Sequence, residues 1–234
     1  MFSKSAEFYD ALYAWKDYAG EAARLREIID RRMPEAKGLL DVACGTGHHL
    51  EHLRRWFSVE GVDVEPSLLA VARARLPGVA LHLGDMRTFS LGRRFDVVTC
   101  LFSSIGYMQT PEDLLHALVN MSGHVAPGGL LIVEPWLSPE RFDPDHLPRP
   151  LVAEGPDFTV VRTNDSRVEG RLSIMRFHYL VGRPGSVTHF VEEHAPALYT
   201  VDEYRAAFEA AGLAAELDPE GLMGRGLWIA RRPS

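Results

Sequence analysis

The chain has 234 residues, of which 46% are hydrophobic and 24% charged, and this composition is typical of a globular protein. The length allows one α/β domain with an elaboration, or two small domains. The formal net charge of −7 argues against a nucleic-acid surface as the main binding site.

Cysteine usage and the N-terminal composition bear on the cellular compartment. The two cysteines, Cys44 and Cys100, have no metal-type spacing, which favours a reduced cytoplasmic protein without a bound metal. Charged residues interrupt the first thirty positions, and no later stretch of uninterrupted apolar residues is long enough to span a membrane. We therefore expect neither a signal peptide nor a membrane segment.

The N-terminal segment is rich in aromatic residues. Residues 1–19 include Tyr9 and Tyr18, and we expect this segment either to form a lid over a binding site or to pack against the next helix. Residues 20–33 have the apolar spacing of an amphipathic helix, which Pro34 ends.

A glycine-rich turn follows. The apolar run 39–43 predicts a strand, residues 44–47 (Cys-Gly-Thr-Gly) a tight turn, and the residues after them a helix. This geometry brings backbone N–H groups and a helix N-terminus towards a ligand. The turn has two of the three glycines of the dinucleotide fingerprint, so on spacing alone it is equally an ordinary βα turn.

Acidic residues follow the next two predicted strands. The second strand ends at 62–64 and places Asp63 where a doubly wound sheet binds the ribose hydroxyls of a nucleoside; the alternative is a carboxylate that caps the next helix. After a helix at 67–75 and a strand at 79–83, Asp85 and Met86 are placed for an adenine ring, or are ordinary loop residues.

The remaining pattern completes an α/β fold. The predicted elements are strand 95–101, loop 102–107, helix 111–122, strand 130–134, a proline-rich connection at 137–150, strand-like runs at 158–163, 172–180 and 187–194, helix 201–212, and strands 213–217 and 226–230. We predict a doubly wound, mostly parallel seven-stranded sheet formed by residues 1–136 and 200–234. An inserted antiparallel sheet at 137–199 is expected to form a substrate wall or a subunit interface.

The acidic positions favour a nucleoside without phosphates. S-adenosylmethionine (SAM) carries a ribose, an adenine and a cationic methionine tail, and it needs no pyrophosphate cradle. The residues that suit it, in chain order, are Asp41, Gly45, Gly47, Asp63 and Asp85.

The motifs Asp41–Gly47, Val62-Asp63 and Gly84-Asp85-Met86 resemble those of class I SAM-dependent methyltransferases. A closer resemblance covers most of the chain and is to the nucleotide-sugar N,N-dimethyltransferases of the desosamine and mycaminose type, which act on dTDP-3-amino-3,6-dideoxyhexoses. The stretches that carry it are 16–18, 39–53, 84–87, 102–106, 133–136 and 224–227.

The resemblance implies a homodimer that methylates the amine of a dTDP-linked amino sugar, once or twice. It assigns SAM contacts to Tyr9, Tyr18 and Ala43 and to the residues named above, Asp41, Gly45, Gly47, Asp63, Asp85 and Met86. It assigns substrate contacts to Phe102, Ser103, Trp136 and Arg225. It also places His124 opposite the substrate amine, whereas the residues alone predict that His124 bonds the last carbonyls of helix 111–122. His48, His49 and His52 are expected on a solvated helix surface rather than around a metal.

Three departures from the family pattern leave the acceptor open. The family usually has glutamate where this chain has Asp63 and a second tryptophan where it has Leu137, and the loop after residue 103 ends in Tyr107-Met108, a variable region of the family. The alternatives are therefore SAM-dependent methylation of another small-molecule amine or hydroxyl, a dehydrogenase on the same sheet, and a SAM-binding protein without turnover.

Overall fold

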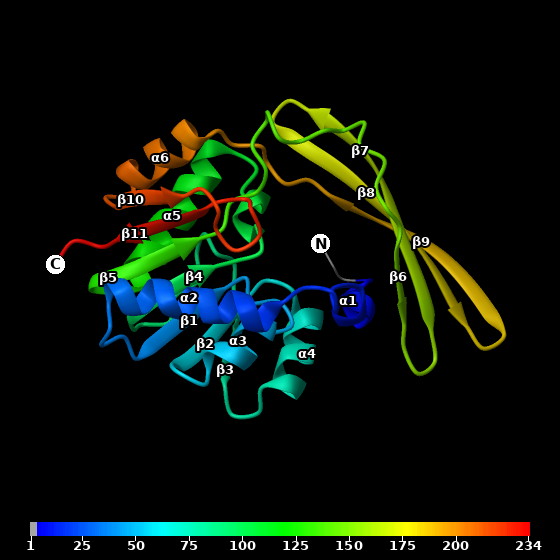
Figure 1. The fold of residues 1–234 in the computed structure, drawn as a ribbon, viewed down its shortest axis with the longest axis horizontal. Helices are drawn as coiled ribbons and strands as arrows, with labels where there is room; N and C mark the ends of the chain where they lie inside the picture. Colours follow the sequence, from blue (N-terminus) through cyan, green and yellow to red (C-terminus); the bar gives the residue numbers. More distant parts are fainter. Residues whose placement is uncertain (1–3) are drawn as a thin grey trace.

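The parallel strands and the two closing strands form one seven-stranded sheet, sheet A, in the computed structural model, which describes residues 4–234 (Figure 1). Its strands are β1 (Gly38–Val42), β2 (Ser58–Asp63), β3 (Ala80–Leu83), β4 (Phe95–Cys100), β5 (Val125–Val133), β10 (Ala214–Asp218) and β11 (Leu227–Arg231). The strand order is β10-β11-β5-β4-β1-β2-β3. Strands β1–β5 run parallel, and β10 and β11 are antiparallel to their neighbours.

Helices cover both faces of sheet A. They are α2 (Tyr18–Arg32), α3 (His48–Leu53), α4 (Pro66–Arg75), α5 (Pro111–His124) and α6 (Val201–Ala210). One apolar core unites α2, α3 and α4 with one face, and a second unites α5 and α6 with the other (Figure 1). This confirms the doubly wound α/β fold. Within residues 4–234 no helix is both long and apolar enough to cross a bilayer.

Side-chain caps explain where several helices begin. Asp17 accepts the backbone N–H of Gly20 at the start of α2 (2.8 Å), and Thr110 accepts that of Asp113 at the start of α5 (3.1 Å). At α6, Thr200 and Glu203 form a reciprocal capping box. Each cap satisfies a backbone donor that the helix itself leaves unpaired.

A second sheet, sheet B, is antiparallel and has the strand order β6-β7-β8-β9. Its strands are β6 (Leu151–Glu154), β7 (Thr159–Glu169), β8 (Leu172–Arg183) and β9 (Ser186–His194). All four lie within the segment 137–199 predicted for the insertion. The two-sheet architecture is confirmed, and the division into separate domains stays a prediction.

The N-terminal segment joins the two sheets. Residues 1–3 of the predicted lid lie outside the described residues, and α1 (Ala6–Leu12) follows them. Phe8 and Leu12 of α1 pack in one buried cluster with Val160 and Tyr179 of sheet B. In Figure 1, α1 lies beside sheet B, on the side of that sheet that faces sheet A.

Two predicted boundaries were wrong. The fifth strand was expected to begin at residue 130, but β5 already begins at Val125, with a register irregularity between its pairs Phe95–Val125 and Val97–Leu130. The strand begins earlier because Arg232, which follows β11, pairs with it: Gly128 N–H donates to the Arg232 carbonyl (3.1 Å), and Arg232 N–H donates to the Gly129 carbonyl (3.0 Å). Strand β6 was also missed, since four residues carry little periodicity.

Asp41 is a carboxyl group inside sheet A. It is 2% exposed on β1, and the Thr99 hydroxyl of β4 donates to it at 2.7 Å. Burial raises the pKa of Asp41 to about 7, although the Thr99 bond opposes the rise. Because the folded pKa lies above the unfolded one, ionisation between pH 4 and pH 7 destabilises the folded chain.

We expect the Asp41→Asn variant to lose less stability than the parent between pH 5 and pH 8. With a pKa of about 4 in the unfolded chain and about 7 in the folded one, the unliganded parent loses on the order of 2–3 kcal/mol between pH 5 and pH 8. Asparagine keeps an oxygen for Thr99 and does not ionise. Thermal unfolding of both proteins across this pH range measures the difference, and parallel curves would contradict the expectation.

Candidate SAM site at the carboxyl edge of sheet A

The turns that follow β1 and β4 have left-handed backbone. Ala43, Phe102 and Ser103 have φ angles of +60°, +51° and +62°, and Gly45 has +56°. This region is costly for residues with a side chain, and such strain gathers at functional sites. A Cβ added at Gly45 would meet no atom within 4 Å. The glycine turn therefore leaves open space above the sheet edge.

Asp63 connects the end of β2 to this turn. One carboxylate oxygen accepts the Gly45 N–H at 2.7 Å and the other accepts the Glu65 N–H at 2.8 Å. Burial raises the pKa of Asp63 above its usual value, even though both backbone bonds favour the charged form. Asp63 therefore supplies fixed acceptor oxygens at the place predicted for a ribose.

Two adjoining cavities open at this edge. The larger has about 490 Å³, within the ~300–1,000 Å³ common for small-molecule sites, and the smaller has about 40 Å³. Both reach Tyr9, Ala43 and Gly45. The larger is also lined by Asp63, Asp85 and Met86, and the smaller by Tyr18, Asp41 and Phe102.

The structure thus brings together all the predicted cofactor residues except Gly47. Gly47 precedes α3 with φ +80°, and a Cβ there would lie 2.6 Å from Leu76 Cδ1. It allows close packing of α3 rather than lining the cavities.

Asp85, which follows β3, lines the larger cavity. Its side chain accepts from the backbone N–H and the guanidinium of Arg87, and these bonds hold the pKa of Asp85 below its usual value. Arg87 also donates to Asp113 at 2.8 Å. The carboxylate is therefore charged and fixed, with Met86 beside it on the cavity wall.

Polar contacts fasten α1 to the glycine turn. One oxygen of Asp10 accepts the Thr46 hydroxyl at 2.7 Å and contacts His48 Nε2 at 3.1 Å. The other accepts from Arg75 of α4 at 2.5 Å. Together with Tyr9 on the cavity wall, these contacts make the N-terminal segment one side of the site.

The solvated surface expected for His48, His49 and His52 of α3 is wrong for His49, which is buried, whereas His48 and His52 are half-buried. His48 stacks on Tyr18 with ring centroids 4.4 Å apart, and His49 contacts buried Glu21 at 2.8 Å. Lys16 donates to the other oxygen of Glu21. Within residues 4–234 no group of three or more histidine, cysteine or acidic residues is arranged to hold a metal ion.

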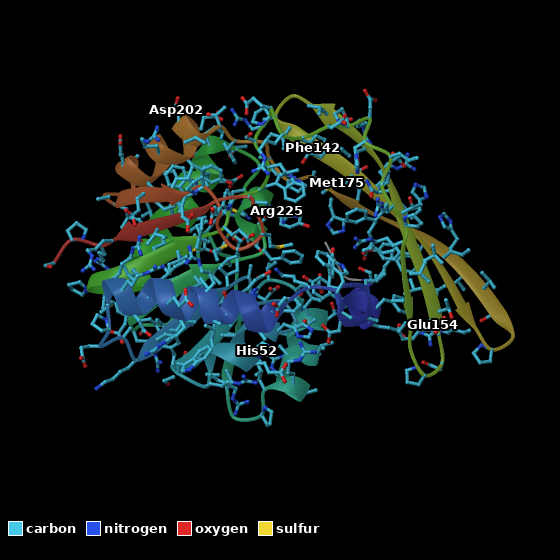
Figure 2. All side chains as sticks on the ribbon, viewed as in Figure 1. His52, Phe142, Glu154, Met175, Asp202 and Arg225 are labelled. Carbon is cyan, nitrogen blue, oxygen red and sulfur yellow. The ribbon has the colours of Figure 1, made fainter. Side chains whose placement is uncertain are left out.

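The four predicted substrate residues lie along the end of β4 and the loops beside it. The Ser103 hydroxyl donates to the Pro135 carbonyl at 2.8 Å and accepts from Arg225 at 3.0 Å. The Arg225 guanidinium lies 5.1 Å from the ring of Trp136 and 5.8 Å from that of Phe102. Figure 2 shows Arg225 at the side of sheet A that faces sheet B.

Glu134 supports this turn from below and is a residue that the sequence analysis did not select. It is fully buried, and one oxygen accepts the Phe102 N–H at 2.6 Å while the other has no hydrogen-bond partner among the described residues. Burial raises the pKa of Glu134 to about 6. It holds the strained Phe102 in position.

The inner face of sheet B supplies further side chains that the sequence analysis missed. Arg162 of β7 donates to the Tyr13 hydroxyl at 2.9 Å and lies 4.5 Å from the ring of Phe177. Tyr13 in turn meets Phe102 edge to face, with centroids 5.3 Å apart. The alternation of side chains along β7 could have indicated this residue, because Arg162 lies on the same face of the strand as Val160, which is buried.

The structure does not bring His124 to this site. His124 immediately precedes β5, so it lies at the amino edge of sheet A, opposite the cavities. Its Nδ1 is 2.8 Å from the Asn120 carbonyl, its Nε2 accepts the Leu91 N–H at 3.3 Å, and its ring stacks on Phe89. The contact with Asn120 matches the helix-end role that the residues alone predicted, and we propose no catalytic role for His124.

A family described as "Methyltransferase domain" matches residues 39–129. The dTDP-3-amino-3,6-dideoxy-alpha-D-glucopyranose N,N-dimethyltransferase of Streptomyces fradiae is 47% identical over 95% of this chain and 89% of its own length.

Two solved structures also resemble it. DesVI of Streptomyces venezuelae is 42% identical, with a TM-score of 0.91 over 99% of both chains. SAM-bound CalS10, an amino pentose methyltransferase from Micromonospora echinaspora, is 43% identical, with a TM-score of 0.83 over 93% of this chain and 92% of that one. With this identity along nearly its whole length, and a nucleoside-shaped site at the expected edge, the chain belongs to the SAM-dependent sugar N,N-dimethyltransferases.

Proposed function

We propose that the protein transfers methyl groups from SAM to the amine of a dTDP-linked amino-deoxysugar. The observation that carries this proposal is the site's two-sided construction. Acidic acceptors line a cavity at the edge of sheet A, and Tyr13 and Ser103 beside that edge bind the guanidinium groups of Arg162 and Arg225, which have no carboxylate within 4 Å among the described residues. The first side suits the donor, and the second suits an anionic acceptor. The substrate of the Streptomyces fradiae relative supports the same substrate class.

The donor side has a residue for each part of SAM. Asp63 offers its oxygens to the ribose hydroxyls, and Asp85 with Met86 would hold the adenine. The methionine end would lie over Gly45, towards Tyr9, Tyr18 and Asp41, where the carboxyl group of Asp41 favours a cation. The open space at Gly45 fits a ligand that approaches the backbone closely.

The acceptor side carries positive charge without an ion pair. Within the described chain, neither Arg162 nor Arg225 has a carboxylate within 4 Å, although both are half-buried. Burial lowers the pKa of Arg225, which means that its charge lacks full solvation. Guanidinium groups bind phosphates in a two-pronged geometry, so the diphosphate of a nucleotide sugar satisfies both.

Methyl transfer needs little covalent help from the protein. SAM supplies an electrophilic methyl group, the amine nitrogen bonds to that carbon as the sulfur–carbon bond breaks, and the nitrogen then loses a proton to solvent. The chain's contribution is to bind both molecules in line and to exclude water, and such positioning can supply much of the rate. Helix α1 contacts both the glycine turn and sheet B, and SAM and the substrate amine would meet in the region that these three elements border.

We also propose that the protein is a cytoplasmic homodimer. Both cysteines are free and buried, which suits a reducing compartment. Helix α1 covers the inner face of sheet B, whereas aliphatic side chains are exposed on its outer face. The exposed fractions are 62% for Val152, 49% for Leu180 and 69% for Val187. Pairing with a second copy would remove this surface from water.

The Asp63→Asn variant tests the donor side. Asparagine loses the charge and replaces one of the two acceptor oxygens by an NH2 donor, so we expect the Kd for SAM to rise about 10- to 100-fold, as for loss of charge-assisted hydrogen bonds. Isothermal titration with SAM measures it. Asp96→Asn is the matched control, because Asp96 also accepts two backbone N–H groups (2.8 Å each) but at the opposite sheet edge. Equal SAM affinity in both variants would refute the assignment.

The Arg162→Met variant tests the acceptor side. We expect the KM for the dTDP-amino sugar to rise about 10-fold or more, because a charged hydrogen-bond partner of the diphosphate is lost, while the Kd for SAM stays unchanged. The control is Arg176→Met, which removes an exposed guanidinium from the opposite face of sheet B. An unchanged KM in Arg162→Met would exclude Arg162 from substrate binding.

The double variant Leu180→Lys, Val187→Lys tests the dimer. We expect the parent to sediment as a dimer at micromolar concentration and the double variant as a monomer, since lysines on both copies would repel and keep water at the interface. Sedimentation velocity distinguishes the two states. A monomeric parent, or a double variant that remains dimeric, would contradict the proposed interface.

A further inference from the structure

A tyrosine–histidine pair connects the two sides of the site. Tyr107, in the 3₁₀ turn η1 (Ser104–Tyr107) after β4, has its hydroxyl 2.7 Å from Nδ1 of His194, the last residue of β9. His194 is 1% exposed, and its ring lies 4.9 Å from that of Phe177 on the inner face of sheet B. The hydroxyl of Tyr107 is therefore held by a buried, packed partner.

The pair lies where donor and acceptor would meet. Tyr107 lines the larger cavity together with Tyr9 and Asp63, on the nucleoside side. Through the His194 contact it also adjoins the inner face of sheet B, because the His194 ring packs on Phe177, whose ring lies 4.5 Å from the Arg162 guanidinium. Tyr107 thus borders both the predicted SAM position and the predicted sugar position.

Both members of the pair are uncharged at neutral pH. Burial raises the pKa of Tyr107 far above its usual range, so the phenol keeps its proton. Burial lowers the pKa of His194 to about 3, so the imidazole stays neutral. In the tautomer with an unprotonated Nδ1, Tyr107 donates to His194 and turns its oxygen lone pairs away from that bond.

We propose that the oxygen of Tyr107 accepts an N–H of the substrate amine and so directs the nitrogen lone pair at the SAM methyl group, with His194 fixing the orientation of the Tyr107 hydroxyl. This inference rests on the proposed function. It makes Tyr107 a residue in contact with substrate and His194 a positioning residue.

A neutral acceptor suits this reaction better than a carboxylate. A carboxylate would favour the ammonium form, in which no lone pair is available for attack. The phenol oxygen binds an N–H of the free amine without adding that bias. A primary amine offers two N–H bonds and the monomethyl amine one, so the same contact serves both transfers, and the uncharged dimethyl product has none left to offer.

The Tyr107→Phe variant is the direct test, with dTDP-3-amino-3,6-dideoxy-α-D-glucopyranose as the probe. We expect single-turnover methyl transfer to slow about 100-fold, with the Kd for SAM within about 2-fold of the parent. The KM for the sugar should change less than kcat, because the diphosphate contacts remain. Tyr204→Phe, which removes a buried hydroxyl from α6, is the matched control and should keep the parent rate.

Two substitutions at His194 separate positioning from packing. Asparagine places an oxygen near the position of Nδ1 and still accepts the Tyr107 hydroxyl, whereas leucine fills the space without an acceptor. We expect His194→Asn to retain most of the single-turnover rate and His194→Leu to lose as much as Tyr107→Phe. Equal rates for the two His194 variants would show that the histidine only packs, and would overturn its assigned role.

The outcomes for Tyr107 are also separate from those for the proposed function. If the parent methylates the probe and Tyr107→Phe does so within about 3-fold, the inference is wrong and the function stands. If Tyr107→Phe loses SAM affinity instead, Tyr107 belongs to the donor side and the inference is again wrong. If the parent binds SAM but leaves the probe unmethylated, the proposed substrate class fails first.

Discussion

The site depends on two buried carboxylates that hold strained backbone in place. Asp63 accepts the N–H of Gly45 after β1, and Glu134 accepts that of Phe102 after β4, where residues with side chains have positive φ. Left-handed backbone at Phe102 and Ser103 costs free energy that these bonds offset. The turns open a cavity at one edge of the sheet and direct Phe102 towards sheet B. The rest of the site is built around these two turns.

The two sheets divide the work of recognition. Sheet A provides close backbone approach and fixed acceptors, which suit a nucleoside with hydroxyl groups and a cationic tail. Sheet B provides a guanidinium held between aromatic rings, which suits an anion. Helix α1 contacts both, through Asp10 to the glycine turn and through Phe8 and Leu12 to sheet B. Neither sheet alone encloses the region between them.

Local patterns made the donor side predictable. A strand, a glycine turn and a helix follow one another in the sequence, and the carboxyl ends of parallel strands meet at one edge. Topology therefore predicts that Asp63 and Asp85 lie at that edge, where they line one cavity. The acceptor side depends on pairings between distant segments. Arg162 contacts Tyr13, 149 residues away in the sequence, and Tyr107 contacts His194, 87 residues away. Neither contact can be predicted from a spacing pattern in the sequence. His124 shows the converse error, because family position suggested the amine while its helix-end location put it at the other edge.

The attachment of the N-terminus to β9 has a consequence for how the protein becomes functional. The backbone N–H groups of Lys4 and Ser5 donate to the carboxylate of Glu192, nearly the whole chain away. Contacts of such long range close late, since the loop-closure entropy must be overcome first. On the ribosome, the α1 wall cannot dock until the last strand of sheet B has emerged. A nascent chain can therefore form the glycine turn early, yet it acquires a closed donor pocket only after β9 has been synthesised.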